Sequence, residues 1–251
     1  MDFREIIAAL PRARRFNRIG SDPGFILVVS ALAVGWPAEA VTAVWPRHTI
    51  DAESKGADGV RVADANGDGQ LDVVTGWEEG GVVRVYLHPG AARVRQPWPA
   101  VTVGSVISPE DAVFFDVDGD GSTDVISSCE GTNRRVFVHW APGKSDRPLS
   151  SSPWSTEAFP AVAGRAMWMF AAPAQVDRRG GTDLVVGGKG SGAVIGWLRA
   201  PSEPRRLSAW KFQPLRDVGW VMSLRCEDLD LDGDWDVLAS DRKGEIGRAH
   251  V

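Results

Sequence analysis

The feature that most constrains the fold is a short acidic loop that recurs along the chain. Three copies read DANGDGQLDVV, DVDGDGSTDVI and DLDLDGDWDVL, and they begin at Asp64, Asp116 and Asp228. A weaker copy, QVDRRGGTDLV, begins at Gln175, so successive copies start 52 to 59 residues apart. Because self-similarity at a regular spacing is the mark of repeat architectures, we expect the chain to be built from units of about 50 residues.

The sequence around each loop predicts strands. Runs such as VRVA and DVVTGW flank the first loop, and a third β-like run and a fourth run that follows a tryptophan come after it. The chain contains 28 Gly and 16 Pro, which suit many tight turns. Four short strands per unit predict an all-β fold, a β-propeller of four-stranded antiparallel blades. The recurrent tryptophans, which we expect to pack within the blades, are Trp45, Trp98, Trp154 and Trp210.

Oxygen-bearing residues alternate along each of the three strong loops, at positions 1, 3, 5 and 9, and a backbone carbonyl is available at position 7. Alternate side chains of a tight turn converge on one point, and carboxylate, amide and carbonyl oxygens suit Ca²⁺. Without His or Cys in the set, zinc and copper are disfavoured. The predicted calcium ligands are Asp64, Asn66, Asp68, Gln70 and Asp72 in the first loop, Asp116, Asp118, Asp120, Ser122 and Asp124 in the second, and Asp228, Asp230, Asp232, Asp234 and Asp236 in the last.

Two alternatives concern the same loops. An EF-hand needs a Glu at position 12 and a helix on each side, but position 12 is Thr75, Ser127 or Ala239. The EF-hand is therefore disfavoured. A solvated Asp/Gly turn without metal stays open, because both residues favour turns by themselves.

The weaker copy, at 175–183, differs at position 5, where Arg179 replaces a carboxylate. A guanidinium at that position would lie where the ion belongs. We predict that this loop is metal-free and that Arg179 neutralises Asp177 or Asp183.

The repeated loop with its following β run resembles the FG-GAP/VCBS repeats, calcium-binding β-propeller blades also found in integrin α-chains. The resemblance covers residues 41–244 and implies a secreted propeller, typically of seven blades, of which about 3.5 are present. Residues 44–50 read as a fourth strand with no blade ahead of it, and the third and fourth strands of the last unit are missing from the pattern. Residues 245–251 (EIGRAHV) match no blade, and we expect them to be a non-native tail from sequencing-adapter read-through.

The N-terminal residues 1–40 have the three parts of a signal peptide: a basic stretch, the apolar run FILVVSALAV and an A-x-A end. An uncleaved anchor or a buried strand is the alternative. We therefore expect a secreted, periplasmic or cell-surface protein without a transmembrane span in the mature chain. The two cysteines, Cys129 and Cys226, are expected to be buried free thiols rather than a disulfide.

Charge and motifs narrow the function. A formal net charge of −5 argues against a nucleic-acid partner. No histidine has the spacing of a metal site or a catalytic triad, so no catalytic residue is assigned.

In the resembled propellers, the segments that lead into each blade's first strand surround the mouth of the central channel. These segments hold acids, cations and tryptophans that would suit a sugar or a peptide, although solvated charges and packed tryptophans are the simpler alternative. We expect a binding module for a glycan or a protein. A calcium-dependent lyase or sugar dehydrogenase and a structural repeat of a larger surface protein are the rivals. The candidate ligand-binding residues are Lys55, Asp58, Glu110, Asp111, Arg165, Trp168 and Trp220.

Overall fold

The computed structural model describes residues 45–143, 153–242 and 245–250. The chain divides into two units, residues 1–45 and 46–251, and all the strands described below belong to the second unit. The predicted signal peptide at 1–40 lies outside the described residues.

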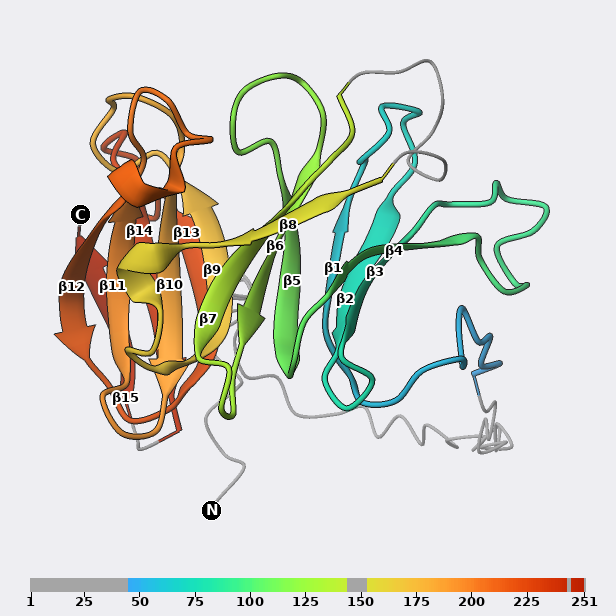
Figure 1. Ribbon diagram of the computed structural model, residues 1–251, viewed down its shortest axis with the longest axis horizontal. Helices are drawn as coiled ribbons and strands as arrows, with labels where there is room; N and C mark the ends of the chain where they lie inside the picture. Colours follow the sequence, from blue (N-terminus) through green and yellow to red (C-terminus); the bar gives the residue numbers. More distant parts are fainter. Residues whose placement is uncertain (1–44, 144–152, 243–244, 251) are drawn as a thin grey trace, which may run out of the picture. The chain divides into compact units, whose positions relative to one another are not determined.

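Strands make up almost all of the regular structure, in four antiparallel sheets that follow one another in chain order (Figure 1). Two 3₁₀ turns, η1 (Pro160–Val162) and η2 (Leu207–Ala209), complete it. The predicted all-β, partial propeller fold is confirmed. The strands are β1 (Ala57–Ala63), β2 (Asp72–Trp77), β3 (Val82–Tyr86) and β4 (Ala100–Ser105) in blade 1; β5 (Pro109–Phe115), β6 (Asp124–Cys129), β7 (Arg135–Trp140) and β8 (Ser155–Ala158) in blade 2; β9 (Met167–Ala174), β10 (Asp183–Lys189), β11 (Val194–Arg199) and β12 (Lys211–Asp217) in blade 3; and β13 (Val221–Glu227), β14 (Asp236–Asp241) and β15 (Glu245–His250) in blade 4.

The acidic loops occupy equivalent places in the four blades, because each joins the first strand of a blade to the second. We call them loop 1 (64–72), loop 2 (116–124), loop 3 (175–183) and loop 4 (228–236). Strands β2 and β6, which follow loops 1 and 2, are buried at every residue. Both faces of these two strands are therefore covered, and the loops are fixed to the most buried strands of their blades.

The hydrophobic core lies between blades. The first strands contact each other in series, β1 with β5, β5 with β9 and β9 with β13. Between blades 2 and 3, the fully buried Trp140, Trp168 and Phe159 pack in one cluster. Gly104 of blade 1 meets blade 2 so closely that a Cβ would lie 2.1 Å from Nδ1 of His139, so glycine is required there.

Two expectations for the first tryptophan are wrong. Residues 45–50 form no strand, and Trp45 is 89% exposed rather than packed in a blade. Trp210 is buried as predicted, and Trp98 and Trp154 are half-buried against hydrophobic clusters. Trp45 shares the local sequence of the others, but it has no strand to open and no sheet face to cover.

Blade 4 contains a third strand that the sequence pattern did not indicate. Strand β15 pairs antiparallel with β14, from Asp241↔Glu245 to Asp236↔His250. Strand pairing uses backbone hydrogen bonds, which nearly any sequence can form. The pairing of β15 therefore does not test the origin of residues 245–251, and the adapter read-through stays a prediction. Both cysteines are free, Cys129 buried as expected and Cys226 only half-buried.

Candidate functional site: acidic loops and the opposite mouth

The four acidic loops share one backbone shape. Position 4 has a positive φ in every copy, at Gly67 (77°), Gly119 (75°), Arg178 (56°) and Leu231 (62°). A side chain in the left-handed region costs on the order of 1 kcal/mol, so the surrounding structure imposes this turn where glycine is absent. The shape that converges the ligand positions is therefore preserved even in the weak copy.

The aspartate at position 9 fixes each loop to its blade. Asp72, Asp124, Asp183 and Asp236 are the first residues of the second strands and are at most 1% exposed. In loop 2, the carboxylate of Asp124 accepts the backbone N–H of Val117 at 3.1 Å and that of Ala141 at 2.7 Å. These two hydrogen bonds come from the backbone N–H groups of loop position 2 and of the residue after the third strand. We call the pair of bonds the latch.

Asp183 makes the same latch in loop 3, with the N–H groups of Val176 at 3.1 Å and Ala200 at 2.7 Å. The latch therefore does not depend on carboxylates at positions 1 and 5, where loop 3 has Gln175 and Arg179. Sequence reasoning treated position 9 only as a metal ligand. Its retention in the weakest copy was the signal for a second, structural role.

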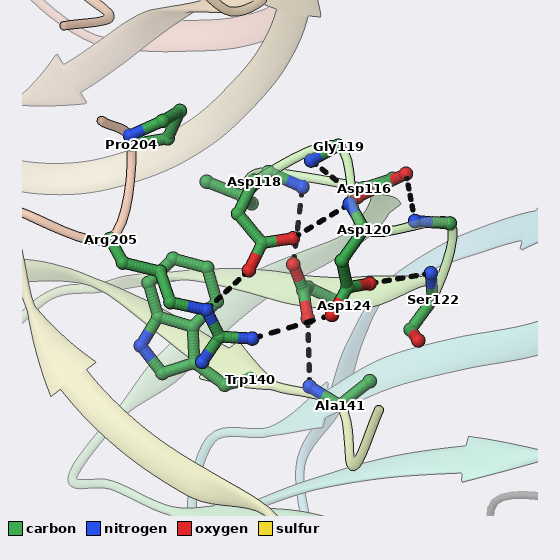
Figure 2. Close-up of polar contacts among 12 residues, drawn as sticks. Asp116, Asp118, Gly119, Asp120, Ser122, Asp124, Trp140, Ala141, Pro204 and Arg205 are labelled. Carbon is green, nitrogen blue, oxygen red and sulfur yellow. Dashed lines mark hydrogen bonds and ion pairs between the residues drawn. The ribbon is translucent and has the colours of Figure 1, made fainter. Parts of the chain in front are cut away.

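Loop 2 gathers its carboxylates at one point (Figure 2). The backbone N–H groups of Gly119 and Gly121 hold Asp116 at 2.8 and 2.9 Å. One oxygen each of Asp116, Asp118 and Asp124 lie within 4.8 Å of one another. Burial raises the pKa of Asp124 to about 7, and the charges of its neighbours add to this rise. A cation would lower that pKa and hold the cluster ionised, so these residues fit Ca²⁺.

Loop 4 fits a cation for a further reason. Oxygens of Asp228, Asp230 and Asp232 lie within 4.8 Å of one another. Among the described residues, Oδ1 of Asp228 is buried and accepts no hydrogen bond. A buried carboxylate oxygen without a donor is costly unless a positive charge compensates it. A hard cation such as Ca²⁺ would be coordinated by these carboxylate oxygens and would compensate the buried Oδ1 of Asp228.

Loop 1 is held mainly by its own backbone. Asp64 accepts the N–H groups of Gly67 and Gly69, both at 2.8 Å. The side-chain amide of Asn66 donates to Asp68 at 3.2 Å. The predicted ligands of this loop are thus arranged around the same turn.

Loop 3 corrects one prediction. Arg199, and not Arg179, neutralises Asp177, with Nε 2.7 Å from Oδ2. Arg179 contributes only its backbone N–H to that carboxylate, at 3.0 Å. Arg178 reaches loop 4 instead, where its Nη2 lies 2.6 Å from Oδ1 of Asp234. The absence of metal from loop 3 stays a prediction.

The opposite ends of the blades carry a second group of charges, which we call the mouth cluster. Carboxylate oxygens of Asp58, Glu78 and Glu110 lie within 4.8 Å of one another. Lys189 lies 3.4 Å from Glu110 and forms an ion pair with Glu130. Burial, and then the charge of Glu130, raises the pKa of Glu110 to about 7. The cluster therefore joins blades 1, 2 and 3 through partly desolvated charges.

Only part of the mouth cluster was predicted. Sequence reasoning named Asp58 and Glu110 and missed Glu78, Glu130 and Lys189. The missed residues lie at or just after the ends of second strands, opposite the acidic loops. Their sequence position could have indicated the cluster, because the end of each second strand follows its acidic loop at a nearly constant distance along the chain.

Trp220 lies beside the mouth cluster between two cations. The Nζ atom of Lys189 and the guanidinium carbon of Arg242 each lie 4.7 Å from a ring of its indole. The indole is half-buried, so its environment combines an aromatic face with fixed positive charge.

Two other candidates serve as packing groups. The buried carboxylate of Asp111 accepts two hydrogen bonds of 3.1 Å from Arg61, whose guanidinium lies over the ring of Phe170 at 5.7 Å. Trp168 is fully buried and donates its indole N–H to the carbonyl of Val162 at 3.1 Å. These contacts join neighbouring blades and leave neither side chain open to a ligand.

The last two candidates are exposed and stand apart from the mouth cluster. Arg165 lies over the ring of Phe212 at 5.1 Å and donates to the carbonyl of Ala161 at 2.7 Å. Lys55 accepts a backbone hydrogen bond from Gly80. No contact between either side chain and the mouth cluster occurs in the part of the chain that the structure describes.

Comparison with known proteins identifies the repeat and the fold. Residues 64–127, from loop 1 into β6, match the family model of the FG-GAP-like repeat. No curated protein sequence matches the chain. A chain in the crystal structure of BBS1N in complex with ARL6DN, soaked with mercury, is similar with a TM-score of 0.52 and 10% sequence identity.

This likeness covers 82% of the chain and 58% of the matched one, and at that identity it shows the fold alone. The resemblance to FG-GAP repeats and the propeller architecture are confirmed. In the described residues, no helix has the length and apolar character needed to cross a membrane.

Proposed function

We propose that the chain is part of a secreted, calcium-stabilised β-propeller that binds a glycan or a protein partner. The observation that carries the calcium role is loop 4, where three carboxylates converge and one buried oxygen of Asp228 lacks a donor. Loops 1 and 2 present equivalent oxygens on the same turn. When bound, Ca²⁺ would tie the first and second strands of a blade together and neutralise their carboxylates.

The calcium role is tested by thermal unfolding of the full chain with calcium and with a chelator. Because Ca²⁺ binds the folded loops only, its removal should lower the melting temperature by several degrees. Magnesium should not restore it, since these loops offer more ligands than Mg²⁺ readily accepts. An identical melting temperature with calcium and with chelator would contradict the role.

The partner-binding role is supported by the mouth cluster and Trp220. Sugars and peptides are commonly bound by an aromatic face beside a few fixed charges, and propeller ligands often bind at this end of the blades.

Binding is tested by screening the calcium-loaded protein against immobilised glycans and by repeating each positive interaction with Trp220→Ala. We expect the variant to lose at least tenfold in affinity, because aromatic anchors supply a large part of such contacts. Trp45→Ala is the control, since this exposed tryptophan is not part of the blades. Equal binding by Trp220→Ala and the unmodified chain would exclude the mouth as the site.

An enzymatic function is favoured by one observation, the pKa of Glu110. A carboxyl group with a pKa of about 7 is suited to general acid–base catalysis near neutrality. The other proposed acid–base groups do not contact it among the described residues, since Asp111 is bound to Arg61 while the side chains of Lys55 and Arg165 are exposed. The binding function is therefore preferred.

A further inference from the structure

A guanidinium from blade 3 lies against loop 2 of blade 2 (Figure 2). Arg205 belongs to the connection between β11 and β12, and its Nε binds Oδ2 of Asp118. Its Nη2 lies 3.5 Å from Oδ2 of Asp120. The guanidinium carbon also lies 4.7 Å from the ring of Trp140. A tethered cation thus contacts the ligand side chains at positions 3 and 5.

The carboxylate oxygens of loop 2 are all accounted for with Arg205 in this place. Both oxygens of Asp116 and both of Asp124 accept backbone N–H groups. Asp118 and Asp120 each use Oδ1 for a backbone N–H and Oδ2 for Arg205. The guanidinium therefore satisfies the two carboxylate oxygens that the backbone leaves over.

Loops 1 and 4 are arranged differently. In loop 1, the equivalent oxygen of Asp68 accepts a hydrogen bond from the neutral amide of Asn66. In loop 4, Arg178 binds Asp234 at position 7, and the buried Oδ1 of Asp228 keeps no donor among the described residues. Among the described residues, loop 2 is thus distinguished from loop 1 by a cation that contacts positions 3 and 5.

The geometry points to Arg205 as an internal competitor of calcium, which gives loop 2 a lower calcium affinity than loop 1. This inference rests on the proposed calcium role. Ca²⁺ needs the oxygens of Asp118 and Asp120 that Arg205 contacts, so the guanidinium must leave before the ion is bound. The side chain of Arg205 is 54% exposed and that of Asp118 is 9% exposed, so solvent screens the pair from the arginine side and a higher calcium concentration displaces the guanidinium.

The competition has a structural consequence. With Arg205 in loop 2, blades 2 and 3 are joined by an ion pair and by the stacking on Trp140. With calcium in loop 2, that ion pair is replaced by bonds within blade 2. Calcium occupancy therefore determines how strongly the connection at 200–210 is fixed to the neighbouring blade.

The inference is tested by calorimetric titration of the full chain with calcium. The unmodified protein should show a tight class of sites and a weak one, and Arg205→Gln should raise the affinity of the weak class about threefold to tenfold. Arg206→Gln is the matched control, because it removes the same charge from the exposed neighbouring residue. Terbium luminescence excited through tryptophan should rise at lower metal concentration in Arg205→Gln.

A melting experiment separates competition from a merely structural role. In chelator, Arg205→Gln should unfold at a slightly lower temperature, because the ion pair between blades is lost. In saturating calcium, it should unfold at the same or a higher temperature than the unmodified chain. A lower melting temperature under both conditions would overturn the inference.

The two proposals fail in different ways. If neither the unmodified chain nor Arg205→Gln binds calcium, the proposed function and this inference both fall. If the unmodified chain binds calcium and Arg205→Gln leaves every affinity unchanged, the inference alone falls. If Arg205→Gln does not fold, Arg205→Lys replaces it, since it keeps the charge and loses the fork that spans both carboxylates.

Discussion

Single residues illustrate how burial sets the chemistry of this protein. His139 is fully buried between blades 1 and 2, with Nε2 2.9 Å from Oγ of Ser127 and Nδ1 2.8 Å from Oγ1 of Thr156. Burial lowers its pKa to about 3. The imidazole is therefore neutral at physiological pH and serves as a hydrogen-bonded core group rather than as a metal ligand or a base.

This low pKa predicts acid sensitivity. Between pH 6.5 and 3 the unfolded chain binds a proton at His139 that the folded chain does not, so the free energy of unfolding falls as pH falls. The slope from this residue approaches about 1.4 kcal/mol per pH unit. Denaturant unfolding at pH 7.5, 6 and 5 should therefore show a shallower dependence for His139→Gln than for the unmodified chain. His48→Gln, at an exposed position, is the control, and parallel pH profiles for all three proteins would contradict the assignment.

At the scale of the element, local sequence predicted more than long-range contacts did. The alternation of Asp and Gly specifies the turn by itself, and the following β run specifies the second strand, so repeat positions and strand order were predictable. The partners of Asp177 and Asp118 were not, because Arg199 and Arg205 come from other strands and connections and meet the loops only after the blades pack. The same reason hid Lys189 from the sequence.

The latch can be separated from the metal in loop 3. Asp183→Asn places an amide group against two backbone N–H groups that the buried carboxylate now satisfies. We expect a loss of about 2–4 kcal/mol in the free energy of unfolding, equal with calcium and with chelator. Asp124→Asn in loop 2 should lose stability that depends in part on calcium. Asp177→Asn, at a half-buried position without the latch, is the control, and a calcium-dependent effect of Asp183→Asn would show that loop 3 binds metal.

For the whole molecule, the proposed calcium sites would add increments to the stability that the packing between blades provides. A site half-saturated near 10⁻⁴ M contributes about 1.4 kcal/mol in millimolar calcium, so two or three sites contribute about 3–4 kcal/mol. In a domain of this size each 1 kcal/mol shifts the melting temperature by about 2–4 °C. The chelation experiment should therefore lower it by roughly 6–15 °C, with loop 2 contributing only at the higher calcium concentrations.

The latch has a consequence for how such a chain can change over time. Because Asp183 secures its blade through backbone bonds alone, the other ligand positions of loop 3 could be exchanged without loss of the blade. Loop 3 also supplies positive charge to its neighbour, since Arg178 reaches Asp234. If loop 3 binds no ion, as predicted, a propeller built this way can keep its architecture without one of its ion sites and use that loop as a counter-charge for the site beside it.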